Sequence, residues 1–171
     1  MKGQRPFRLL ASGPALALLL GCAPVLADGS APEPCGAKQA LVFACTMARG
    51  KRLSLCGAPP ATLQYRFGSP SRADLIFPAA AAEGASRMRF AQYHRYQVER
   101  SEVVFDNAGV AYTVFDETRS GVRRAGVSVQ GAGQAREQIL MCRGPVIGTL
   151  SALKPHLPCD ADSALQGGTC R

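Results

Sequence analysis

The chain contains no tryptophan and only two histidines, and charged residues make up just 19% of it. Histidine is the usual general base beside a Ser or Cys nucleophile, so the two histidines argue against a hydrolase of this kind. No Gly-x-Ser-x-Gly turn is present either. No Cys-x-x-Cys pair occurs, which argues against a zinc site. Lys and Arg form no long run, so the sequence predicts no specific recognition of nucleic acid. We expect no cofactor and no metal.

The first 27 residues have the pattern of a signal peptide. Three basic residues precede an apolar stretch at residues 9–20, which is too short to anchor a chain across a bilayer. Cleavage after Ala27 predicts a periplasmic or secreted protein, and no later apolar stretch is long enough for a transmembrane anchor. An alternative stays open, because residues 19–22 resemble a bacterial lipobox. In that case the product is an outer-membrane lipoprotein attached through Cys22.

The net charge gives only general information about partners. Without the basic residues of the leader, Lys2, Arg5 and Arg8, 17 of the 20 basic residues remain against 12 acidic ones, a net charge of +5. A moderate positive excess favours acidic partners, mainly through nonspecific attraction. The candidate partners are an anionic component of the cell envelope or an acidic protein.

The cysteine count predicts disulfide bonds. Six cysteines remain after the predicted cleavage, and an even number in an exported chain favours three disulfides. Residues 41–56 contain two apolar runs around a turn at Arg49-Gly50 or Gly50-Lys51, which predicts a β-hairpin. In this hairpin Cys45 and Cys56 lie opposite each other or two residues out of register, so they are the predicted pair. The pairing stays open for the other four, Cys35, Cys142, Cys159 and Cys170.

Short alternating segments separated by Gly and Pro predict an all-β fold. We expect an antiparallel β-sandwich or barrel-like meander, held by disulfides, with one short C-terminal helix at residues 146–154. Residues 79–86 are expected to form a surface loop, and residues 87–98 a single strand. The predicted organisation is a signal peptide at 1–27, an N-terminal arm at 28–39, a β domain at 40–158, and a C-terminal tail at 159–171 that cysteines anchor.

Several of these segments occur together in a recognisable order. They are LVFACT, GKRLSLC, LQYRFG and DLIFP in succession, followed later by AYTVFDE. This series resembles a family of small exported bacterial proteins that carry an apolar-x-Cys-Thr strand, a Gly-Lys turn, a second Cys and a Tyr-Arg-Phe-Gly strand. The resemblance covers residues 35–142. It implies export and a shared β fold, and it assigns no activity and no site residue.

One predicted strand face has the composition of a binding surface. Arginine presents forked donors to phosphate, sulfate or carboxylate, and tyrosine adds an amphipathic surface. We therefore expect an exported, non-enzymatic binding or structural protein of the cell envelope that contacts an anionic ligand here. An ordinary solvated sheet face is the other interpretation. The candidate binding residues are Arg66, Arg87, Arg89, Tyr93 and Arg95.

Two further functions stay open from the sequence. Small disulfide-bonded β domains also serve as secreted inhibitors of host or competitor enzymes, although a basic chain is repelled by a basic target. A hydrolase is the third hypothesis, because two suitably placed carboxylates suffice for glycoside hydrolysis. The candidate carboxylates are Glu99, Glu102, Asp116 and Glu117.

Overall fold

Antiparallel strands build the fold, as the alternating segments predicted. The structure, a computed structural model, describes residues 35–36, 39–166 and 170; the predicted signal peptide, Cys22 and most of the predicted N-terminal arm lie outside the described residues. Within the described part the strands are β1 (Leu41–Met47), β2 (Arg52–Cys56), β3 (Gln64–Ser69), β4 (Arg72–Phe77), β5 (Arg89–Arg95), β6 (Val98–Asn107), β7 (Val110–Arg119), β8 (Val122–Gly131) and β9 (Gln138–Gly148).

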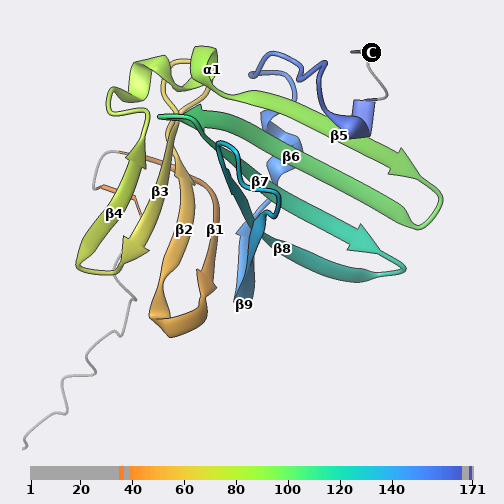
Figure 1. Ribbon diagram of the computed structural model, residues 1–171, viewed down its shortest axis with the longest axis horizontal. Helices are drawn as coiled ribbons and strands as arrows, with labels where there is room; N and C mark the ends of the chain where they lie inside the picture. Colours follow the sequence, from red (N-terminus) through yellow and green to blue (C-terminus); the bar gives the residue numbers. More distant parts are fainter. Residues whose placement is uncertain (1–34, 37–38, 167–169, 171) are drawn as a thin grey trace, which may run out of the picture. The chain divides into compact units, whose positions relative to one another are not determined.

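The strands form one sheet with the order β4-β3-β2-β1-β9-β8-β7-β6-β5 (Figure 1). Strands that follow each other in the chain are neighbours in the sheet, except β4 and β5, which lie at its two edges; β9 joins the two halves because it pairs with both β8 and β1. Residues 138–141 of β9 pair with β8, and residues 142–148 pair with β1. The sheet changes direction at β9 and curls, so β1–β4 and β5–β8 enclose one core. The all-β, antiparallel prediction is confirmed.

The core fills the inside of the curl, where side chains from both ends of the sheet meet. Phe105 on β6 stacks on Phe77 of β4 and on Tyr112 of β7, with ring centroids 4.4 Å and 4.9 Å apart. The ring of Tyr65 on β3 lies 5.0 Å from that of Phe105, and burial raises the pKa of its hydroxyl. Because side chains alternate along a strand, filling the core leaves the other face of β5–β9 for polar residues.

Short helical turns connect the strands. They are η1 (Ala48–Gly50), η2 (Ala81–Glu83), α1 (Gly84–Arg87), η3 (Leu150–Leu153) and η4 (Ala164–Gln166). The C-terminal helix is shorter than predicted, because residues 146–148 continue β9 beside β1 and only η3 is helical. Leu150 and Leu153 of η3 are buried in the core. The loop expected at residues 79–86 contains η2 and the start of α1.

Three disulfides join the described cysteines, namely Cys35–Cys56, Cys45–Cys142 and Cys159–Cys170. The number of bonds is confirmed and the predicted Cys45–Cys56 pair is wrong. The bond from Cys45 to Cys142 fastens β1 to β9. The bond between Cys159 and Cys170 lies within the C-terminal tail, and backbone hydrogen bonds on either side of Cys159 join the tail to β5. Phe90 of β5 donates to the carbonyl of Pro158, and Asp160 donates to the carbonyl of Phe90, each at 2.8 Å.

The register of the β1–β2 hairpin explains the wrong pair. Cys45 lies opposite Leu53, and Cys56 lies opposite Leu41. The turn contains three residues at η1, whereas a turn of two residues was assumed. A shift of one residue moves a side chain to the other face of the sheet. Cys45 therefore packs in the core with Leu53, and Cys56 lies on the opposite side, where Cys35 meets it.

Candidate functional site

The pairing of β5–β9 places rows of side chains on the outer face, which we define as the face of these strands that points away from the core, and three adjacent rows include Arg100 and its neighbours. Directly opposite residues in antiparallel strands share a face, with Cβ atoms about 4.5–5.5 Å apart. The first row holds Ala91, Glu102, Phe115, Gly126 and Met141, the second holds Tyr93, Arg100, Glu117 and Arg124, and the third holds Arg95, Val98, Arg119 and Val122.

Arg100 binds the two carboxylates at the centre of the outer face. Its Nε donates to Glu102 Oε1 at 2.7 Å, and its Nη1 donates to Glu117 Oε2 at 2.8 Å. The guanidinium also lies over Phe115, 4.8 Å from the ring centroid. The hydrogen bond from Arg100 lowers the pKa of Glu117, and Arg119 donates a further bond to this carboxylate at 3.0 Å. The centre is therefore an ion-pair network in which Glu117 is ionised at neutral pH.

An open hollow of about 410 Å³ lies beside this network. Tyr93 and Arg95 line it from β5, Arg119 lines it from β7, and residues 163–165 of the C-terminal tail form part of its wall. The guanidinium of Arg95 lies over the ring of Tyr93, 5.7 Å from its centroid. The hollow thus combines an aromatic ring with Arg95 and Arg119 at the side of the ion-pair network, whose Arg100, Glu102 and Glu117 also line it.

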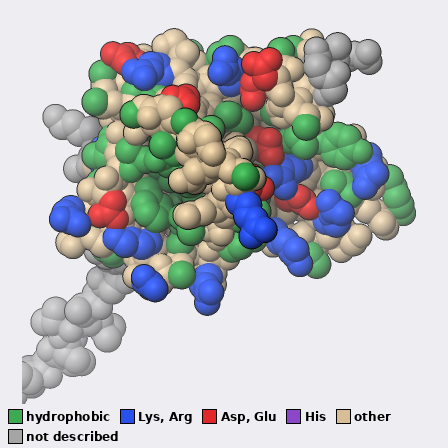
Figure 2. Space-filling view, viewed as in Figure 1, with side chains coloured by type: hydrophobic (Ala, Val, Ile, Leu, Met, Phe, Trp, Pro, Cys, Tyr) green, Lys and Arg blue, Asp and Glu red, His purple; other side chains and the backbone are tan. Residues whose placement is uncertain are grey.

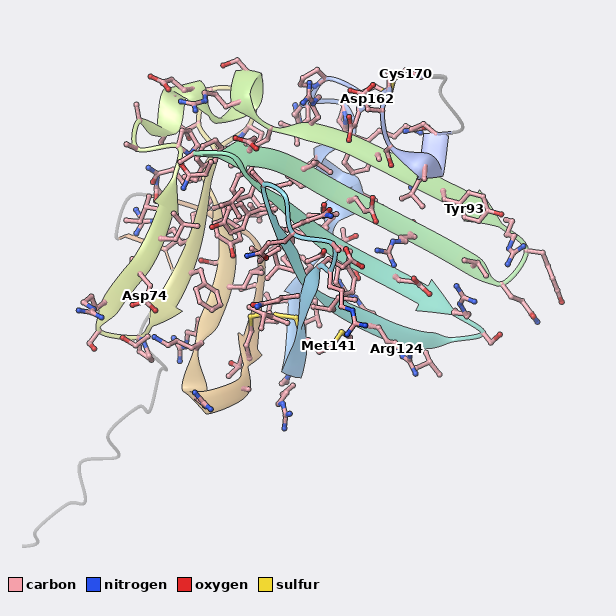
Figure 3. The ribbon with its side chains drawn as sticks, in the orientation of Figure 1. Asp74, Tyr93, Arg124, Met141, Asp162 and Cys170 are labelled. Atoms are coloured by element: carbon pink, nitrogen blue, oxygen red, sulfur yellow. A yellow bond between two sulfur atoms is a disulfide. The ribbon has the colours of Figure 1, made fainter. Side chains whose placement is uncertain are left out.

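A second hollow of about 340 Å³ lies on the other side of Arg100, over β6–β9. Ile139 and Met141 of β9 contribute apolar side chains, exposed at 54% and 40%, and Arg124 contributes a charge. Arg124 has no acidic partner in the part of the chain that the structure describes. Figure 3 shows Tyr93, Arg124 and Met141 on their strands. In Figure 2 basic and acidic side chains mix over β6–β8.

The structure brings together only two of the five predicted binding residues in these hollows, Tyr93 and Arg95. Arg87 ends α1 and pairs with Glu83 at 3.3 Å, while Arg89 pairs with Asp160 at 3.6 Å. The prediction of one strand over residues 87–98 is wrong, because β5 ends at Arg95 and the chain turns before β6.

Arg66 lies apart from the others, on β3. It donates to Gln64 Oε1 at 3.1 Å and lines a separate hollow of about 240 Å³ together with Arg52 and Arg72. The side chain of Arg72 in turn pairs with Asp74 at 3.4 Å. The expectation that Arg66 extends the β5 surface therefore has no support in the contacts of this residue.

The four candidate carboxylates divide between the two faces of the sheet. Glu102 and Glu117 lie on the outer face, whereas Glu99 and Asp116 alternate with them and lie on the other side. A glycoside hydrolase needs a carboxylic acid with a raised pKa. The hydrogen bond from Arg100 has the opposite effect on Glu117. This arrangement favours structural ion pairs over acid catalysis.

Sequence reasoning missed Arg100, Arg119 and Arg124 as members of the same surface. Part of the signal was present. Ser120 and Gly121 form a two-residue turn in which both residues have positive φ, 49° and 80°, the conformation of a tight hairpin. Recognising that turn fixes the register of β7 and β8 and places Glu117 opposite Arg124.

The fold and the outer face define the class of this protein as a disulfide-bonded, antiparallel β domain with an arginine-rich outer face. No known protein family matches the chain, and neither a curated protein nor a solved structure matches it. The resemblance to small exported bacterial proteins therefore stays a prediction. Among the described residues, no three His, Cys, Asp or Glu side chains gather as metal ligands, and no helix is long and apolar enough to cross a membrane.

Proposed function

We propose that this chain is an exported, non-enzymatic binding protein of the bacterial cell envelope, and that its outer face contacts an anionic ligand. Three disulfides support a location outside the cytosol, because disulfides form and persist in oxidising compartments. The pattern of residues 1–27 supports a periplasmic or secreted protein, with attachment through Cys22 as the alternative.

The proposal depends on one observation above all. Arg95 and Arg124 flank the ion-pair network of Arg100, and neither has an acidic partner among the described residues. The arginines within the network are already neutralised by Glu102 and Glu117. An incoming anion therefore gains most from the two outer arginines, whose guanidinium groups offer several donors in a fixed plane.

Retention on a dextran sulfate column tests which arginines contact an anion. We expect Arg95→Ser combined with Arg124→Ser to elute at clearly lower salt than the wild type, because unpaired cations contribute most to binding a polyanion. The matched control is Arg87→Ser with Arg89→Ser, which removes the same charge from residues that are paired with Glu83 and Asp160. This control should elute near the wild type.

Equal shifts for the two double variants would show that retention follows net charge alone, and the assignment to the outer face would fail. Circular dichroism of each variant checks that the fold is kept. The inhibitor hypothesis uses the same surface, since an acidic enzyme is one kind of anionic ligand. Crosslinking of the mature protein in cells, followed by mass spectrometry, separates the two: recovery of a single enzyme favours the inhibitor.

A further inference from the structure

Two hairpin ends lie side by side at one edge of the outer face and are joined by a backbone hydrogen bond. The β5–β6 turn contains Tyr96 and Gln97, and the β7–β8 turn contains Ser120 and Gly121. The amide of Ser120 donates a hydrogen bond of 2.8 Å to the carbonyl of Gln97, which ties the two turns together. The ends of the β5–β6 and β7–β8 hairpins lie next to each other in Figure 1. We call residues 95–98 and 119–124 the hairpin ledge.

The hairpin ledge combines exposed apolar side chains with positive charge. Tyr96 is 88% exposed and Val122 is 60% exposed, the two largest values among the exposed large hydrophobic residues of the described chain. The ledge contains no acidic residue, and its basic residues are Arg95, Arg119, Arg123 and Arg124. Arg119 is paired with Glu117 and Arg123 with Asp116, whereas Arg95 and Arg124 have no acidic partner among the described residues.

We infer that the hairpin ledge docks onto the surface of an anionic phospholipid bilayer. This inference rests on the proposed function and names the anionic partner of that same face. Tyrosine is enriched at membrane interfaces, where its ring enters the apolar region and its hydroxyl stays in water. Arginine is attracted by anionic headgroups, and its apolar stem lies along the interface. Tyr96 and Val122 project at the ends of their hairpins, with arginines beside them, as this mode of contact requires.

The positive charge of the hairpin ledge favours an anionic lipid surface over an apolar protein partner. Ile139 and Ile147 on β9 are also exposed, at 54% and 55%, yet they lie along a strand rather than at a hairpin end. The ledge places its apolar side chains at two adjacent turns, so both can enter a flat interface while the arginines face the headgroups. A soluble polyanion carries negative charge but has no apolar layer. Comparing binding to a polyanion with binding to a bilayer therefore tests whether the apolar side chains contribute.

Cosedimentation of the mature protein with phosphatidylglycerol vesicles tests this docking, with phosphatidylcholine vesicles and dextran sulfate as separate comparisons. The first variant is Tyr96→Ser with Val122→Ser, which removes apolar side chains and no charge. Its matched control is Ile76→Ser with Ile147→Ser, which removes side chains exposed at 40% and 55% on β4 and β9. The second variant is Arg95→Ser with Arg124→Ser, and its control is Arg49→Ser, at the β1–β2 turn.

We expect the wild type to bind phosphatidylglycerol vesicles and not to bind phosphatidylcholine vesicles. Loss of Tyr96 and Val122 should weaken vesicle binding by about ten-fold while retention on dextran sulfate is unchanged. Loss of the two arginines should weaken vesicle binding by about twenty-five-fold, at about five-fold for each charge. Both controls should bind vesicles nearly as the wild type does.

The outcomes separate this inference from the proposed function. Retention on dextran sulfate without vesicle binding overturns bilayer docking and leaves the anion-binding face in place. Vesicle binding that survives the loss of Tyr96 and Val122 also overturns it, because the ledge is then not the contact. Failure to bind either vesicles or dextran sulfate removes both proposals.

Discussion

Replacing Arg100 with methionine tests the ion-pair network at the centre of the outer face. Arg100 donates two short hydrogen bonds, of 2.7 Å to Glu102 and 2.8 Å to Glu117. A hydrogen bond to a charged group contributes about 1.5–3 kcal/mol, and the lower end applies because the side chain of Arg100 is 29% exposed. Methionine keeps an apolar contact with Phe115. We expect Arg100→Met to lower the free energy of unfolding by about 3 kcal/mol at neutral pH.

The difference in free energy of unfolding between the wild type and Arg100→Met should become smaller in acid. The hydrogen bond from Arg100 holds the pKa of Glu117 in the folded protein below its ordinary value of 4.5. A carboxyl group with a lowered pKa stabilises the fold fully above its unfolded value, and this stabilisation is lost as the pH falls through the folded pKa. The wild type therefore loses this contribution in acid, and the variant has less of it to lose. The difference between the two proteins should shrink as the pH falls below 4.5.

Urea unfolding followed by far-ultraviolet circular dichroism measures this difference, with the disulfides intact, at neutral pH and near the acid limit of stability. Arg119→Met is the matched control, because Arg119 makes one bond to Glu117 and its side chain is 62% exposed. We expect a deficit below about 1 kcal/mol for the control. The argument that Arg100 stabilises ionised carboxylates is refuted by either of two results. One is that Arg100→Met loses no more free energy of unfolding than Arg119→Met does, and the other is that its loss stays constant with pH.

Three further substitutions test the architecture. In Gly126→Ala the new Cβ would lie 2.3 Å from the carbonyl oxygen of Leu140, so we expect a loss of about 2 kcal/mol in urea unfolding, and an unchanged midpoint would contradict the close approach of β8 and β9. Cys45→Ser with Cys142→Ser opens a bond between residues 97 apart and should lower stability by about 4–5 kcal/mol in thermal unfolding. Phe105→Ala removes the ring at the centre of the aromatic core and should cost about 3–5 kcal/mol in the same measurement.

The class of fold was predictable because it depends on composition and alternation over many residues. The β1–β2 hairpin was placed correctly around its Gly50 turn, and the number of disulfides followed from the even count of cysteines. The disulfide partner of Cys45 was not predictable from the same local pattern. It depends on whether the turn has two or three residues, and one residue decides which face a cysteine occupies. Local sequence patterns therefore predict that a hairpin forms, but they predict its register less well.

The β5–β6 hairpin was missed for a different physical reason. Tight turns are usually marked by Gly, Asn, Asp or Pro, because these residues accept positive φ or fix the turn geometry. Here the chain turns at Tyr96 and Gln97, and Gln97 itself adopts a φ of 59°. Pairing along the full length of β5 and β6 outweighs the local cost of this conformation. A sequence without a turn signal therefore appeared as one long strand.

The candidate site was hidden because it consists of residues brought together by three successive hairpins. Tyr93, Arg100, Glu117 and Arg124 each come from a different strand, and an error of one residue in any turn transfers all later members to the core face. The net charge of the chain was no guide either. Glu102, Asp116 and Glu117 lie within strands, where they neutralise arginines, while the hairpin ledge at the ends of β5–β6 and β7–β8 carries four arginines and no acid. The local field at those ends is therefore stronger than the overall balance of charges indicates, and its position follows from strand register rather than from composition.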